Sequence, residues 1–190
     1  MQDPGVSDLV LNLILYICLP TWVIAGFADW WCHRKTKIEE TSGLKESLMH
    51  SLMGLQVGFP IVVSLFFEVN VLILLVCLLV LISHEIVAHH DVVYSSPVRE
   101  ITIWEVHAHA FLSTIPFYIF ALIVVRRWET FLKMITLDWS GELGLELRTE
   151  SLGGDHFVPV YLVFMLIVGV LPYVEENLRC WRASRLKPNQ

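Results

Sequence analysis

Five long runs of apolar residues alternate with polar segments along the chain. The runs cover residues 9–31, 46–67, 70–90, 102–125 and 157–175. A helix needs about 20 residues to cross the hydrocarbon core of a bilayer, and each run reaches roughly that length. The pattern predicts an all-α polytopic membrane protein. We expect a bundle of about five transmembrane helices that forms one integral membrane domain over residues 1–190.

Four of these runs contain a proline, at Pro20, Pro60, Pro116 and Pro172. Neighbouring helices can satisfy the carbonyl group that a proline leaves free in a membrane helix. We therefore expect kinks rather than breaks at these positions. A tight turn over residues 67–70 is expected to join the second and third helices.

Composition supports the membrane class and narrows the functional classes. Hydrophobic residues make up 55% of the chain and charged residues 17%, whereas about 25% of a soluble domain is charged. The formal net charge of −6 and the lack of a long Lys/Arg-rich tract argue against nucleic-acid binding. The first run has no basic leader and no small-residue cleavage site, so we expect a retained helix rather than a signal peptide.

The distribution of Lys and Arg predicts an orientation. Five helices would place residues 34–45, residues 91–101 and the region after residue 176 on one side, with nine Lys and Arg residues. The opposite side would hold four, all within residues 126–156. Because cytoplasmic segments carry an excess of basic residues, we expect the C-terminus in the cytoplasm and the N-terminus outside.

This topology collects seven of the eight histidines at the cytoplasmic face. They stand at the ends of the first four helices: His33, His50, His84, His89, His90, His107 and His109. His156 falls on the other side. Residues that are distant in the sequence are thus brought to one depth by the topology alone.

An acid precedes a histidine by four residues on each of these four helices. The pairs are Asp29/His33, Glu46/His50, Glu85/His89 and Glu105/His109. Residues four apart project from one face of a helix, and about one such pair is expected by chance. Ionisable residues can also snorkel to the membrane surface, but snorkelling does not require matched pairs on four helices.

Metal binding explains this arrangement. Imidazole and carboxylate groups are ligands for iron, zinc and manganese, and carboxylates can bridge two ions. Helix bundles build such dinuclear sites from Glu-x-x-His pairs, which are one residue shorter. We predict two bound metal ions, iron as the first candidate and zinc as the alternative. The expected ligands are His33, His50, His89, His109, Asp29, Glu46, Glu85 and Glu105.

The three glutamates, Glu46, Glu85 and Glu105, are also the expected catalytic carboxylates, as metal ligands or bridges. Asp29 has the alternative role of orienting His33. His84, His90 and His107 lie about 100–200° around their helices from the paired residues, so they are candidates for additional ligands or for hydrogen bonding to ligands. Arg99, in the loop between the third and fourth helices, is interpreted as one of the positive charges typical of the cytoplasmic side.

The segment His84–His90 (HEIVAHH) resembles the histidine boxes of the membrane-bound di-iron desaturases and hydroxylases. That superfamily also keeps its histidines at the cytoplasmic ends of membrane helices, and the resemblance extends over residues 29–109. It implies iron, dioxygen and an external electron donor protein. The implied substrate is an acyl chain or another lipophilic molecule that enters from the membrane lipid.

Three other functions remain open. In a zinc-dependent membrane lipid hydrolase, zinc would activate water and Glu46 would act as general base. A metal transporter or sensor would place ionisable ligands near the membrane midplane, whereas residues 71–82 are almost wholly apolar. A haem protein would use two facing histidines.

Overall fold

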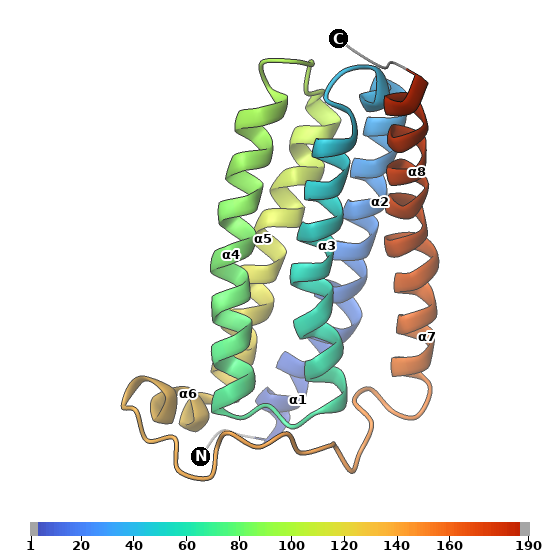
Figure 1. The fold of residues 1–190 in the computed structure, drawn as a ribbon. Coiled ribbons are helices and arrows are strands. Elements are labelled where there is room, and N and C mark those ends of the chain that lie inside the picture. Colours follow the sequence, from blue (N-terminus) through green and yellow to red (C-terminus); the bar gives the residue numbers. More distant parts are fainter. Residues whose placement is uncertain (1–3, 187–190) are drawn as a thin grey trace.

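The computed structural model describes residues 4–186, which form an all-α bundle (Figure 1). Within that range, five helices are long and apolar enough to span a membrane, which confirms the predicted fold class. They cover Gly5–Thr36, Gly43–Phe66, Val71–Ser95, Ile103–Arg126 and Phe157–Leu186. The observed helices extend past the predicted apolar runs mainly at the end of the bundle that carries the histidines. Most of the polar residues there therefore belong to the helices and not to loops.

Two of the five helices are composite. The first consists of α1 (Pro4–Leu13), the π-helical η1 (Ile14–Cys18) and α2 (Leu19–Thr36). The last consists of α7 (Phe157–Phe164), the π-helical η3 (Met165–Val170) and α8 (Leu171–Leu186). Between them run α3 (Gly43–Phe66), α4 (Val71–Ser95) and α5 (Ile103–Arg126), with the short helices η2 (Ile38–Glu40) and α6 (Trp128–Ile135) in the connections. Figure 1 shows α1 and the last turn of α8 at opposite ends of the bundle.

Helix continues through all four prolines, as expected. Pro60 and Pro116 lie inside α3 and α5. Pro20 and Pro172 each stand just after a π-helical segment, in which Leu19 and Leu171 donate backbone hydrogen bonds five residues back. Proline lacks an N–H group and clashes with the preceding turn, and a wider turn relieves both problems.

Local signals fix the helix ends that carry the polar residues. Lys37 adopts a left-handed conformation, with φ of 53°, and ends α2. The Thr102 side chain accepts a hydrogen bond from the Glu105 N–H at 3.3 Å and begins α5. At the other end of the bundle, Asn70 caps α4 in the same way through the Ile73 N–H, so the turn over residues 67–70 lies where the sequence predicts it. Helices α2 and α5 are thereby held with their acid–histidine pairs at one level.

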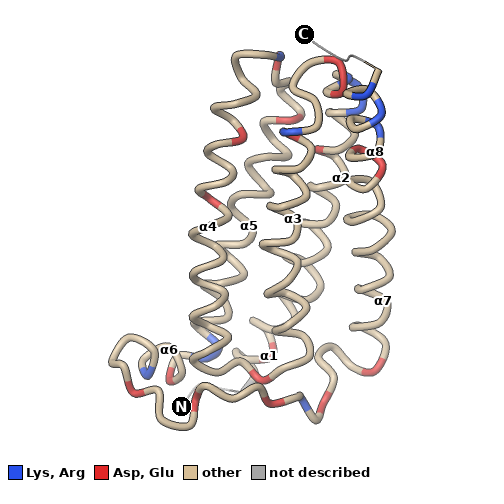
Figure 2. Tube along the Cα trace, viewed as in Figure 1, with Lys and Arg blue, Asp and Glu red and all other residues tan. Residues whose placement is uncertain are grey.

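The surface of the bundle is apolar along its length. Large side chains such as Leu55, Val160 and Leu79 are more than half exposed, as expected for a face that contacts lipid rather than water. Lys and Arg gather around the end where α8 finishes (Figure 2). The main apolar core lies toward the opposite end and includes Leu15, Leu19 and Ile61. Above this core the interior becomes polar.

Candidate metal centre

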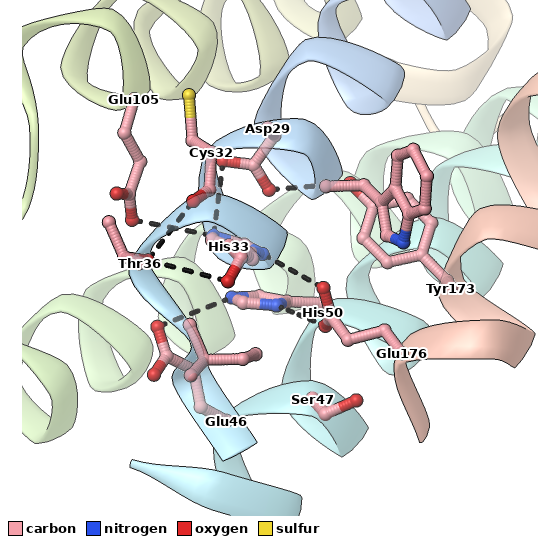
Figure 3. Close-up of polar contacts among 12 residues, drawn as sticks. Asp29, Cys32, His33, Thr36, Glu46, Ser47, His50, Glu105, Tyr173 and Glu176 are labelled. Carbon is pink, nitrogen blue, oxygen red and sulfur yellow. Dashed lines mark hydrogen bonds and ion pairs between the residues drawn. The ribbon is translucent and has the colours of Figure 1, made fainter. Parts of the chain in front are cut away.

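Nine ionisable side chains meet inside the histidine-bearing end of the bundle. This polar cluster consists of Asp29 and His33 (α2), Glu46 and His50 (α3), Asp91 (α4), Arg99 (the α4–α5 loop), Glu105 and His109 (α5) and Glu176 (α8). All are buried except His109, whose side chain is 23% exposed. All five long helices or their connections contribute. Figure 3 shows the central members pointing toward one another.

Two stacked histidines form the centre of the polar cluster. The rings of His33 and His50 lie 4.3 Å apart, centroid to centroid, and are within 13° of parallel. The Nδ1 atom of each lies 3.1 Å from a different oxygen of Glu176. A carboxylate can only accept, so both Nδ1 atoms carry a proton in these contacts. Glu176 thereby fixes both rings and leaves both Nε2 atoms facing away from it.

The Nε2 atoms of the two stacked rings face further carboxylates. His33 Nε2 lies 3.3 Å from Glu105 Oε1 and 3.4 Å from Asp29 Oδ1. His50 Nε2 lies 3.3 Å from Asp91 Oδ2 and 3.8 Å from Glu46 Oε1 (the Glu46 side is visible in Figure 3). An imidazole nitrogen is favourable next to a carboxylate only if it is protonated or if both groups share a cation.

Asp29 carries the clearest unsatisfied oxygen. Its Oδ1 atom lies 2.9 Å from His109 Nε2 and 3.4 Å from His33 Nε2. Neither contact has the alignment of a hydrogen bond, so Asp29 Oδ1 and His33 Nε2 are buried without a hydrogen-bond partner among residues 4–186. The other Asp29 oxygen accepts from the Tyr173 hydroxyl at 3.3 Å. Buried polar atoms are normally paired, so this pair of atoms requires an explanation.

Two groups of donor atoms within the polar cluster could each hold a metal ion. One consists of Asp29, His33, Glu105 and His109, and the other of His33, Glu46 and His50. In each group the ligand atoms lie within 4.8 Å of one another. His33 belongs to both groups, so the two candidate sites adjoin.

Arg99 links the acids of the two groups, which corrects its interpretation as a surface charge. Its Nε donates to both oxygens of Glu46 at 3.0 and 3.1 Å, and its Nη1 donates to Glu105 Oε2 at 3.0 Å. Its Nη2 contacts both glutamates. Burial alone lowers the pKa of Arg99, but the hydrogen bonds to Glu105 and Glu46 outweigh that effect and raise the pKa above its ordinary value. The residue is only 9% exposed because its side chain lies between Glu46 of α3 and Glu105 of α5.

The remaining predicted residues lie outside both groups. Glu85 accepts from the Ser113 hydroxyl at 3.0 and 3.1 Å, well away from the stacked histidines. His89, His90 and His107 are exposed. His84 is buried, with Nε2 4.0 Å from Glu85. None of these five side chains joins the donor groups formed by the described residues.

Helix geometry explains which face of α4 turns inward. Asp91 faces His50, and His84 lies seven residues earlier, about 20° from the same helical face. His89 lies two residues before Asp91 and therefore about 200° away. The acid–histidine spacing gave no signal for Asp91, because residue 95 is a serine and not a histidine. It gave none for Glu176, because α8 contains no histidine.

A cavity of about 950 Å³ adjoins the polar cluster. Asp29, His50, Asp91 and His109 line it at one end, and its other walls are mainly apolar residues of all five long helices.

Comparison with protein-family models, with curated proteins and with solved structures gives no match. The fold and site therefore define the protein's class by themselves. It is an all-α membrane-spanning protein with two buried His/carboxylate groups that could bind metal ions.

Proposed function

We propose that the polar cluster binds two divalent metal ions and that the protein is a membrane metalloenzyme, which oxidises a lipophilic substrate with dioxygen at the cytoplasmic face. The observation that carries the metal proposal is the pairing of Asp29 Oδ1 with His33 Nε2. Both atoms are buried, both lack a hydrogen-bond partner within residues 4–186, and both belong to one group of four donors. A shared cation would satisfy them together.

Charge supports two ions rather than none. The polar cluster has five carboxylates and one guanidinium, so four formal negative charges remain when its histidines are neutral. Uncompensated charge is strongly unfavourable away from water, and two divalent cations would cancel it. Protonation of the histidines would instead place positive charges on His33 and His50, whose stacked rings are 4.3 Å apart. Metal binding avoids that repulsion.

The donor set suggests which residues hold each ion. Asp29, His33, Glu105 and His109 would hold one ion, while His50 and Glu46 would hold the other, with Asp91 beside His50. Arg99 would limit the charge on the two glutamates, and Glu176 would keep both Nε2 atoms available. Hydrogen bonds from ligand histidines to such outer carboxylates are typical of metal sites.

Iron is the proposed metal because a mixed His/carboxylate set inside a helix bundle is characteristic of dinuclear sites that activate dioxygen. The bound iron would supply that activation. Insertion of one oxygen atom into a C–H bond consumes one dioxygen, two electrons and two protons and yields an alcohol and water. The electrons would come from a donor protein, which a site at the cytoplasmic face could reach. The stacked contact of His33 with His50 leaves no room for a haem between them.

Metal analysis of the purified full chain tests the proposal. We expect about two irons per chain, with the optical and Mössbauer signals of a coupled pair. Asp29→Asn should lose at least one iron because it removes a ligand charge without changing the side-chain volume. Asp155→Asn is the matched control, since Asp155 is exposed at the opposite end of the bundle.

Three results would count against the proposal. Protein without bound metal after purification and reconstitution with ferrous iron would overturn it. One colourless zinc per chain would favour the hydrolase, with Glu46 as general base. Equal metal content in Asp29→Asn and Asp155→Asn would show that the metal is bound elsewhere in the protein.

A further inference from the structure

A second polar group lies halfway along the bundle, outside the polar cluster. His84 and Glu85 stand near the middle of α4, and Ser113 stands near the middle of α5. Glu85 is six residues from Asp91, which corresponds to about 9 Å along the helix. Ionisable residues at such a depth in a membrane helix usually serve a function.

Glu85 has no Lys or Arg partner among the described residues. Its two oxygens accept from the Ser113 hydroxyl at 3.0 and 3.1 Å, and His84 Nε2 lies 4.0 Å away. His84 is only 4% exposed, and its Nδ1 atom lacks a hydrogen-bond partner within residues 4–186. The Glu85 side chain is 35% exposed, so a molecule in the neighbouring space can reach it, whereas His84 is buried. The Glu85 carboxylate and the His84 Nε2 atom that faces it would both gain from a ligand that donates hydrogen bonds and carries positive charge.

Both residues line the 950 Å³ cavity that adjoins the polar cluster. Its lining includes the carboxylate of Glu85, which lies outside the polar cluster whose charge the metal ions would cancel, and, among residues 4–186, no Lys or Arg. A cavity with this charge repels a carboxylate or phosphate headgroup and attracts a cation. Its size lies at the upper end of the range for ligand sites, about 300–1,000 Å³.

The cavity also opens toward lipid. Leu55 and Phe59 on α3 and Val170 and Val174 on η3 and α8 line it, and all four are exposed on the outside of the bundle. A lipophilic molecule could therefore enter sideways from the bilayer.

From these observations we infer that the cavity binds a lipophilic amine, with the ammonium group between Glu85, Ser113 and His84 and the alkyl chain along the apolar walls. The ammonium would donate to Glu85, and carbons nearer the histidine-bearing end would face the polar cluster. This inference names the substrate class of the proposed enzyme and so rests on the proposed function, but the binding itself does not require metal.

The test compares three probes with the same chain: dodecylamine, dodecanol and dodecanoate. Their binding to the purified full chain in nanodiscs of zwitterionic lipid is measured, with empty nanodiscs subtracted and the metal content of each sample recorded. We expect dodecylamine to bind at least tenfold more tightly than either of the others. Glu85→Gln should remove most of that preference and leave dodecanol affinity unchanged. Glu100→Gln, at an exposed acid outside the cavity lining, should behave like wild type.

The outcomes separate this inference from the metal proposal. Equal affinities, a preference for dodecanoate, no specific binding of any probe, or an unchanged preference in Glu85→Gln would each overturn it. Wild-type metal content in Glu85→Gln would show that the fold and metal site are intact. Conversely, failure of the metal proposal would appear as absent metal in wild type, whatever the probe preference. If Glu85→Gln does not fold, the wild-type comparison of the three probes still decides.

Discussion

Arg99 offers the sharpest test of how the polar cluster is held together. We expect Arg99→Met to destabilise the protein strongly, because it leaves Glu46 and Glu105, both fully buried, without their shared guanidinium. Removing one partner of a buried ion pair typically costs about 3–5 kcal/mol. For a chain of this size that corresponds to a fall in melting temperature of about 6–20 °C. Thermal unfolding in detergent measures it directly, after chelator treatment so that bound cations do not replace the lost charge.

Arg34→Met is the matched control for this experiment. Arg34 also pairs with a glutamate, at 2.6 Å, but its side chain is 50% exposed. Exposed ion pairs contribute about 0–1 kcal/mol, so the control should melt within a few degrees of wild type. If Arg99→Met melts like Arg34→Met, the proposed burial of Arg99 between the two glutamates is wrong.

Three further predictions concern the metal and the far end of the bundle. Glu176→Gln should weaken metal binding about 10–100-fold in competition with a chelator, because the carboxylate that orients His33 and His50 is lost, and unchanged affinity would exclude that role. Chelator treatment should lower the melting temperature of wild type more than that of Asp29→Asn, which binds at least one ion fewer, since each bound ion stabilises the folded state; equal shifts would contradict this. Glu68→Gln weakens two ion pairs at the opposite end in which Glu68 is 40% exposed, so calorimetry should show a smaller loss of stability than for Arg99→Met, with metal content unchanged.

The sequence predicts the bundle well because membrane helices must satisfy their backbone internally and keep apolar side chains toward lipid. It also predicts the meeting of His33, His50 and His109, since five helices of similar length bring their ends to two levels. Acid–histidine spacing identifies the inward faces of α2, α3 and α5. These inferences need only helix period and topology.

The same reasoning could not identify the inward face of α4. Ionisable residues occupy its second half at His84, Glu85, His89, His90 and Asp91, and together they point in most directions around the helix. Which of them faces inward depends on how the neighbouring helices pack, and the acid–histidine spacing does not contain that information.

The interpretation of Arg99 was wrong, and Glu176 was missed, for a different reason. An arginine in a loop is usually a surface charge, and only the fold of the 96–102 connection brings Arg99 between α3 and α5. Glu176 has no histidine on its own helix, so the spacing rule was silent. Its partners, His33 and His50, come from helices more than 100 residues earlier.

The π-helical segment Ile14–Cys18 sets the rotation of the helix that follows it. A turn closed five residues back holds one more residue than an α-turn, and every residue beyond it is rotated by roughly 100° around the helix axis. Loss of a single residue from Ile14–Cys18 would restore a regular helix and swing Asp29 and His33 out of the interior toward lipid. The alignment of these donors is thus set by an irregularity more than two helical turns away, among residues that lie outside the polar cluster.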